Sequence, residues 1–119
     1  MSEKYVDSFV MPLPKSKVAD YEKFAAKLAV IAKRHGAEEY VNCIADDVKP
    51  GKETSFPQAV KLAEDEVVVQ SWALYPSREA RDKANQAIRD DAEFQKMMPE
   101  MPVDGKRMFM GGFKVLRGL

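Results

Sequence analysis

The chain has one cysteine, one histidine and one tryptophan among its 119 residues, and it has no excess of charge of either sign. Cys43 alone cannot form an intrachain disulfide, and an unpaired thiol is typical of a reducing compartment. Nineteen Lys and Arg balance nineteen Asp and Glu, which argues against a protein that mainly coats phosphate backbones. No apolar run approaches the ~20 residues of a membrane helix, and the first residues lack a signal-peptide pattern. We therefore expect one soluble cytoplasmic domain spanning residues 1–119.

What the chain does have is a repeated unit of strand and helix. Residues 4–12 and 67–75 read as strands, and each precedes a helical pattern, at 16–35 and 78–90. Further strands are expected at 38–46 and 107–116, and a short helix at 91–98. Within the long connection 47–66, a helical turn and a strand extension both fit residues 59–62. The order is that of the ferredoxin-like βαββαβ fold, an α+β class with a four-stranded antiparallel sheet and its helices on one face.

Prolines and serines mark the expected boundaries of these elements. Pro12 and Pro14 should end the first strand, because proline cannot donate to a ladder. Ser16 and Ser77 are the expected N-caps of the two long helices. Phe56 should not be helical, because a proline follows it. Two adjacent glycines in the last strand, Gly111 and Gly112, predict a bulge or a close approach of another backbone.

The first strand is apolar on both of its faces. Phe9 and Met11 lie on one face, and Val6 and Val10 lie on the other. Because both helices cover the same face of the sheet, the opposite apolar face is left bare and predicts a binding surface. The simplest occupant is a second copy of the chain, in a homodimer whose sheets pack face to face.

The whole length resembles the YbaA-like bacterial domain family of unknown function. The resemblance is carried by YVDSFVMPLPK at 5–15, HGAEEYVNCIADDV at 35–48, GKETSFPQAV at 51–60, VVVQSWALYPSREARDKAN at 67–85 and MPVDGKRMFMGGF at 101–113. It implies a ferredoxin-like fold within the dimeric α+β barrel superfamily, and hence a homodimer. That superfamily includes cofactor-free monooxygenases, haem-degrading enzymes and muconolactone isomerases, and the closest family implies no reaction.

His35 has two interpretations. It is either a general base or haem ligand, or it closes the C-terminus of the first helix with its ring on the core. In the haem-degrading relatives, the histidine belongs to the second helix and works with an asparagine of the first strand. Here the second helix has no histidine, and the first strand offers Asp7 and Ser8 instead. We therefore expect no haem and no other cofactor.

Trp72 either fills the core or marks a ligand site. It shares strand parity with Gln70. The sharper hypothesis groups these two residues on one sheet face with Asp7, Tyr40 and Asn42, because buried polar groups must be paired or must line a cavity. Asp7 is then the candidate general base.

Basic residues near the ends of the third strand and the start of the fourth suggest an anion site. Arg78 and Arg107, with Arg81 and Lys106, would bind an anionic ligand, helped by free N–H groups at the start of the second helix. The alternative is a solvated rim. No clustered set of metal ligands is present in the sequence, so no metal site is expected.

Soft apolar residues are expected to serve packing. Cys43 reads as a small buried hydrophobe. Core or dimer packing, rather than a ligand pocket, is the expected role of a methionine set made up of Met97, Met98, Met101, Met108 and Met110.

Two functional classes remain open from the sequence. One is a small-molecule-binding protein, which includes a cofactor-independent enzyme. The other is a structural or regulatory homodimer without catalysis. RNA binding must be considered, because RNA-recognition motifs have the same strand order. It is disfavoured, because the third strand lacks their basic-Gly-aromatic pattern.

Overall fold

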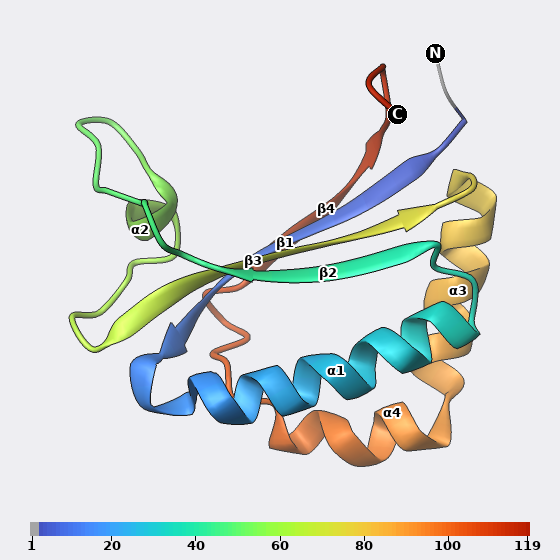
Figure 1. Cartoon of the computed structure of the whole chain (residues 1–119), viewed down its shortest axis with the longest axis horizontal. Helices are drawn as coiled ribbons and strands as arrows, with labels where there is room; N and C mark the ends of the chain where they lie inside the picture. The colour runs from blue at the N-terminus through green and yellow to red at the C-terminus, as the bar shows by residue number, and fades with distance from the viewer. Residues whose placement is uncertain (1–2) are drawn as a thin grey trace.

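The computed structural model describes residues 3–119. Its elements are β1 (Tyr5–Pro14), a 3-10 turn η1 (Lys15–Lys17), α1 (Val18–Arg34), β2 (Glu39–Ile44), α2 (Phe56–Ala59), β3 (Glu66–Tyr75), α3 (Arg78–Asp90), α4 (Ala92–Met97), η2 (Met98–Glu100) and β4 (Phe109–Lys114). The four strands form one antiparallel sheet in the order β2-β3-β1-β4. Helices α1, α3 and α4 lie on one side of this sheet and leave the other side open (Figure 1). The predicted βαββαβ architecture is confirmed.

Strand register decides which side chains meet the helices. Phe9 of β1 lies opposite Ser71 of β3 and opposite Met110 of β4. Its neighbours two residues away, Asp7 and Met11, lie on the same face, because side chains alternate along a strand. We call this the helix face, and we call the opposite side the open face.

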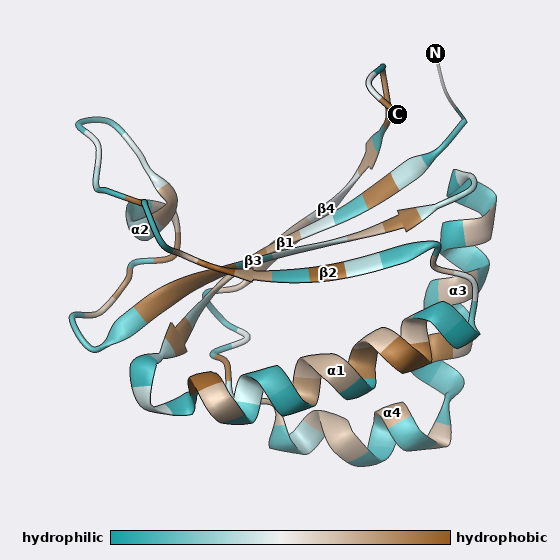
Figure 2. Ribbon diagram, viewed as in Figure 1, coloured by the Kyte–Doolittle hydropathy of each residue, from teal (hydrophilic) through white to brown (hydrophobic). Residues whose placement is uncertain are grey.

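The core fills the space between the helix face and the helices. Ile31 of α1 is fully buried, and Tyr75 of β3 and Ala84 of α3 are nearly so. Burying a side chain the size of Ile31 contributes on the order of 2 kcal/mol. Hydrophobic and hydrophilic bands alternate along α1, as burial of one side requires (Figure 2).

The caps of the helices agree with the sequence in one case and differ in another. The Ser77 hydroxyl accepts a 3.1 Å hydrogen bond from the Ala80 N–H, so the predicted start of α3 is confirmed. The expectation for Ser16 is wrong, because it lies inside η1 and α1 begins after Lys17 without a side-chain cap. At the other end of α1, Gly36 turns the chain with a φ of +120°.

The prolines of β1 do not end the strand as predicted. Pro12 pairs with Val68, and Pro14 pairs with Glu66. Strand β4 pairs with β1 only as far as Val10. Beyond Val10, β1 is hydrogen-bonded on one side only, so a proline there can remain in the strand without breaking a hydrogen bond to β4.

The long connection contains a short helix that begins at Phe56, contrary to the prediction. Its N-cap is Ser55, whose hydroxyl accepts a 3.2 Å hydrogen bond from the Gln58 N–H. Proline in the first turn of a helix costs no hydrogen bond, because the N–H groups there have no partner within the helix. The Ser55 cap therefore outweighs the tendency of Phe56, as the residue before a proline, to avoid helical backbone angles. The following residue Val60 is fully buried, against Val10 and Val68 of the open face.

No helix in the described part of the chain is long and apolar enough to cross a membrane.

Candidate functional site

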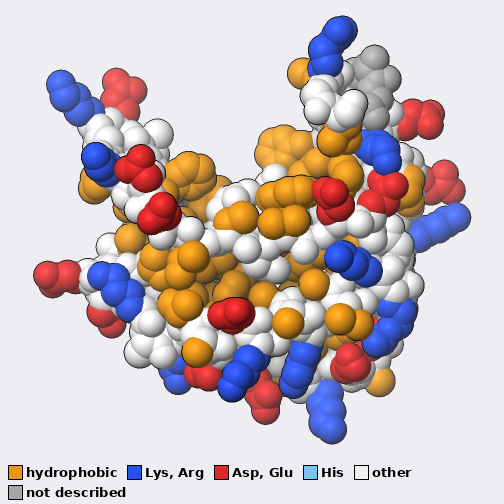
Figure 3. Space-filling view, in the orientation of Figure 1, with side chains coloured by type: hydrophobic (Ala, Val, Ile, Leu, Met, Phe, Trp, Pro, Cys, Tyr) orange, Lys and Arg blue, Asp and Glu red, His pale blue; other side chains and the backbone are white. Residues whose placement is uncertain are grey.

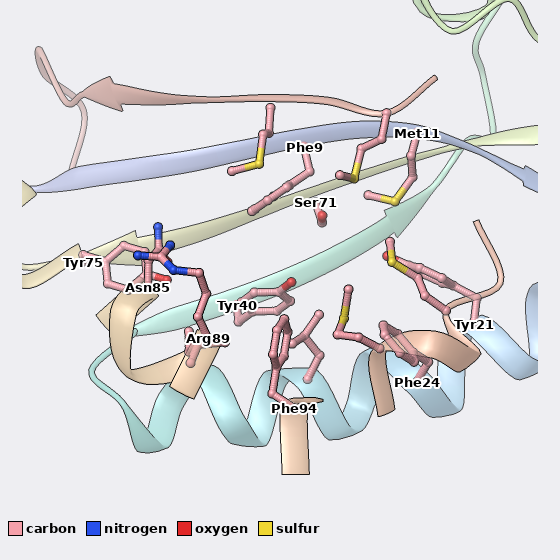
Figure 4. A pocket seen from close by; sticks show the side chains of 16 residues that line it. Phe9, Met11, Tyr21, Phe24, Tyr40, Ser71, Tyr75, Asn85, Arg89 and Phe94 are labelled. Atoms are coloured by element: carbon pink, nitrogen blue, oxygen red, sulfur yellow. The ribbon is translucent and has the colours of Figure 1, made fainter. Parts of the chain in front are cut away.

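A cavity of about 280 Å³ lies between the helix face of the sheet and the helices (Figure 4). We call it the helix-side cavity. Its lining consists of Phe9, Met11, Tyr21, Phe24, Leu28, Tyr40, Ser71, Tyr75, Asn85, Ile88, Arg89, Phe94, Met98, Met101, Met108 and Met110. All four strands and the helices α1, α3 and α4 contribute, so the complete fold is needed to form it.

The walls of the helix-side cavity are aromatic rings and thioethers. Phe9, Phe24 and Phe94 project from β1, α1 and α4 toward the same space (Figure 4). Most of the predicted methionine set lies here too: Met98, Met101 and Met108 pack against the core as expected, and together with Met110 they also line the cavity. Flexible thioethers adapt to irregular apolar partners, which suits a ligand with an apolar body.

The polar groups of the cavity wall come mainly from tyrosines. The Tyr21 hydroxyl donates a 2.8 Å hydrogen bond to Oδ1 of Asn42. Burial raises the pKa of Tyr21 and of Tyr75 to about 12, and burial also raises the pKa of Tyr40. These phenols are therefore protonated at neutral pH. They offer hydrogen bonds to a ligand, and they do not act as bases.

One end of the cavity rests on a buried polar cluster. Asn85 Nδ2 donates a 3.2 Å hydrogen bond to Oδ2 of Asp7, which is 1% exposed. Arg81 Nε lies 3.1 Å from Oδ1 of the same carboxylate. The geometry there is that of an ion pair without a hydrogen bond, since neither of these two atoms has a hydrogen-bond partner in the described structure.

Arg81 occupies the space that a side chain at Gly112 would fill. A Cβ built on Gly112 would lie 2.0 Å from an Arg81 terminal nitrogen and 2.6 Å from the Tyr5 ring. The guanidinium also lies over that ring, 4.7 Å from its centroid. The paired glycines were expected to meet another backbone, but the groups that approach Gly112 are side chains, and the missing Cβ leaves room for Arg81.

Arg89 is the charged group at the edge of the cavity. It lies one turn beyond Asn85 on α3, and residues four apart share a helix face. Figure 4 shows its side chain rising from α3 beside Asn85, toward the end of the cavity where Tyr75 lies. Within the described lining, Arg89 is the only side chain that carries a charge at neutral pH.

The predicted grouping of Trp72 with Asp7 is wrong. Trp72 pairs with Ser8 and Val41, so both it and Gln70 point to the open face, whereas Asp7 lies on the helix face. Tyr40 and Asn42 do share the helix face with Asp7, as predicted. The error lies in the register. Parity within one strand is read from the sequence, but the phase between strands is set by pairing.

The predicted anion site does not assemble. Arg107 binds both carboxylate oxygens of Glu66, at 2.7 and 2.6 Å, and it also contacts Asp104 at 2.8 Å. Glu66 is the first residue of β3, whereas Arg78 follows the last residue of that strand. Arg78 pairs with Asp82 at 3.8 Å. A ten-residue strand therefore separates the two arginines. Arg107 therefore connects the segment before β4 to the start of β3 through its ion pair with Glu66.

His35 is the C-cap of α1, and its side chain contacts Asp91, the N-cap of α4. Its Nε2 lies 2.7 Å from Oδ2 of Asp91, whose other oxygen accepts the N–H groups of Glu93 and Phe94 at the start of α4. This hydrogen bond from His35 is the main reason that the pKa of Asp91 lies below its usual range. His35 is not part of the lining of the helix-side cavity.

Cys43 is exposed, contrary to the prediction of a buried position. It pairs with Gln70 on the open face, where β2 is an edge strand. A second hollow, of about 380 Å³, lies beside it between the open face and the connection that carries Phe56.

Asn85, Arg89, Tyr21 and Tyr75 were not singled out from the sequence. One signal for two of them was present, since Arg81, Asn85 and Arg89 recur at four-residue steps and therefore share one face of the helix. No sequence pattern identifies the tyrosines, because they line the cavity from different elements.

Comparison with solved structures gives the class of fold. A variant of SnoaB, a cofactor-independent oxygenase from Streptomyces nogalater, superimposes with a TM-score of 0.62 at 13% identity over 99% of this chain and 98% of that one. A dimeric ferredoxin-like protein from an uncultured marine organism has a TM-score of 0.62 at 10% identity, over 97% of each chain. These similarities show that the chain has a ferredoxin-like fold.

Residues 4–105 match the family described as Protein of unknown function (DUF1428), and the chain belongs to this family. It is 49% identical to the Uncharacterized protein YbaA of Escherichia coli K12. This match extends over 111 residues and covers 93% of this chain and 95% of that one. The resemblance inferred from the sequence is confirmed.

Proposed function

We propose that this chain is a homodimeric protein that binds an apolar, ring-containing small molecule in the helix-side cavity. The observation that carries the proposal is the cavity itself. About 280 Å³ of space, partly open to solvent, lies between the sheet and the helices among aromatic and methionine side chains. Ligand sites are mostly apolar cavities with a few converging polar groups, and this volume lies at the small end of their usual range.

The lining supports binding and orientation more than proton abstraction. In the described lining there is no carboxylate, imidazole or amine, and burial keeps its phenols protonated. Asp7, the predicted base, lies behind Asn85 and is engaged by Arg81. An enzyme built on this cavity, including a cofactor-independent oxygenase such as SnoaB is described to be, would act on a substrate that enters already ionised.

Blocking the cavity tests the proposal. Leu28→Trp places a large ring into the cavity from α1, whereas Val30→Trp adds the same ring on the exposed side of the same helix, where Val30 is 59% exposed. We expect naphthalene-based ligands to raise the unfolding temperature of the wild type and of the Val30 variant, but not of the Leu28 variant. Equal stabilisation of all three proteins would contradict cavity binding.

The open face supports the homodimer. Phe109 and Phe113 of β4 are 46% and 58% exposed, and Trp72 is half-buried beside them on the same face. Figure 3 shows hydrophobic side chains gathered in the hollow between the connection that carries α2 and the C-terminal end of the chain. An apolar face of this kind marks an interaction surface, and the zero net charge of the chain gives two copies little long-range repulsion.

Sedimentation equilibrium tests the dimer with a matched pair of variants. Phe113→Lys places a charge on the open face, and Val30→Lys places one at an equally exposed apolar position on the helix side. We expect the first variant to be a monomer and the second to be a dimer, like the wild type. A wild type that stays monomeric at micromolar concentration overturns this part of the proposal. The unpaired, exposed thiol of Cys43 supports a reducing location such as the cytoplasm.

A further inference from the structure

Arg89 differs from its neighbours in having no acidic partner. Ion pairs with carboxylates are formed by Arg34, Arg78, Arg81 and Arg107. Arg89 instead donates a 2.9 Å hydrogen bond to the neutral amide of Gln86, and it forms no ion pair within residues 3–119. A guanidinium without a counter-charge thus stands at the edge of a cavity whose other lining groups are uncharged at neutral pH.

We propose that the ligand of the helix-side cavity is an amphiphilic anion, with an apolar ring body among the methionines and phenylalanines and one carboxylate held by Arg89. This inference rests on the proposed function and adds to it the chemical class of the ligand. The planar guanidinium fork matches a carboxylate with two parallel hydrogen bonds, which gives it both charge and direction.

The groups around Arg89 favour an anion over a neutral or cationic ligand. Asn85 donates one of its two amide N–H groups to Asp7, and Arg89 is the charged donor at this end of the cavity. The hydroxyl of Tyr75, which stays protonated, adds a donor. A cation would meet Arg89 with no carboxylate in the described lining to offset the repulsion.

The overall charge of the protein does not explain such a preference. Basic and acidic residues balance, so no long-range field draws anions to the molecule. Discrimination between an anion and its neutral analogue must therefore come from local groups, and substituting one arginine should remove it.

Calorimetric titration with three ligands of one ring system tests the inference. The ligands are 2-naphthoate, the neutral 2-naphthamide and the cationic 2-(aminomethyl)naphthalene, each titrated into the full chain at pH 7. We expect 2-naphthoate to bind about fivefold more tightly than the amide, a factor typical of ion pairs at exposed sites, and the cation to bind most weakly. The preference should shrink as salt is added.

Variants assign the preference to one residue. Arg89→Gln should make naphthoate and naphthamide bind equally, and Arg89→Lys should keep part of the preference. Arg78→Gln removes the same charge from the same helix at an exposed position outside the cavity, and it should leave the preference intact. Because Arg89 is exposed and forms no ion pair in the described structure, its replacement should leave the unfolding temperature almost unchanged.

The outcomes separate this inference from the proposed function. If naphthamide binds as tightly as naphthoate, or if Arg89→Gln leaves the preference unchanged, the anion inference is overturned while cavity binding stands. If none of the three ligands binds, the proposed function fails and the inference fails with it.

Discussion

The amide nitrogen of Asn85 donates a 3.2 Å hydrogen bond to the carboxylate of Asp7, and this contact joins α3 to the central strand at one end of the helix-side cavity. Asp7 therefore contacts the cavity wall through Asn85. It holds Asn85 in one orientation and counterbalances Arg81, 3.1 Å away, without lining the cavity.

Replacing Asp7 should cost stability because it leaves Arg81 without its buried partner. We expect Asp7→Asn to lower the free energy of unfolding by about 1–3 kcal/mol, because it removes the buried charge that faces Arg81 Nε while Arg81 keeps its 2.8 Å ion pair with Asp82. The double variant Asp7→Asn with Arg81→Met should regain part of this loss. Urea unfolding of the four proteins of the cycle measures the coupling, and additive losses would show that the pair does not interact.

The two adjacent glycines of β4 should respond differently to alanine. At Gly112 a Cβ would overlap the Arg81 guanidinium and the buried Tyr5 ring, whereas at Gly111 the nearest atom, on Phe113, is 3.5 Å away. We expect Gly112→Ala to destabilise by about 1–3 kcal/mol, the usual cost of overpacking, and Gly111→Ala to cost much less. Thermal unfolding compares them. Equal effects would mean that Arg81 is not fixed in this position.

Glu66 should contribute to acid unfolding through Arg107. Their hydrogen bonds hold the pKa of Glu66 below its usual range, so the folded state binds this proton less readily than the unfolded chain does. The stabilisation is present above the ordinary pKa of glutamate, about 4.3, and is lost as pH falls through the lower folded value. In Arg107→Met we expect lower stability at pH 7 and a weaker pH dependence below about 4.3. Urea unfolding across pH measures this. A slope identical to that of the wild type would contradict it.

His35 should act on stability and not on ligand binding. His35→Ala removes the 2.7 Å contact with Asp91 that links the end of α1 to the start of α4. We expect a lower unfolding temperature and an unchanged affinity for 2-naphthoate. Asp91→Asn, which keeps an oxygen to cap α4, should show the same pattern. A large loss of affinity in both variants, at a temperature where they remain folded, would show that His35 acts on the ligand as well as on stability.

Much of the fold was predictable because it depends on local patterns. Three consecutive valines and Ser77 define β3 and the start of α3, and both were predicted to within a residue. The errors at Pro12 and Phe56 have one cause. Each local rule depends on where the neighbouring strand or cap lies, and tertiary structure supplies that information.

The site was less predictable because it depends on the phase between strands. Asp7, Tyr40 and Asn42 were correctly placed on one face, but Trp72 was assigned to the wrong one. A shift of one residue in register moves every side chain of a strand to the other face, and the sequence of a single strand does not reveal it. Arg89 was missed because its property, the lack of a carboxylate partner in the described structure, exists only in three dimensions.

The most direct test of cavity binding uses the methionines as reporters. Five methionines line the helix-side cavity, and their methyl groups should respond to a bound ligand: Met11, Met98, Met101, Met108 and Met110. Met97 is buried in the core outside this cavity and serves as the control. In methyl-labelled protein titrated with 2-naphthoate, we expect NMR shift changes at the five lining methionines and little change at Met97. Binding of 2-naphthoate that leaves all five methionines unshifted would contradict binding in the helix-side cavity.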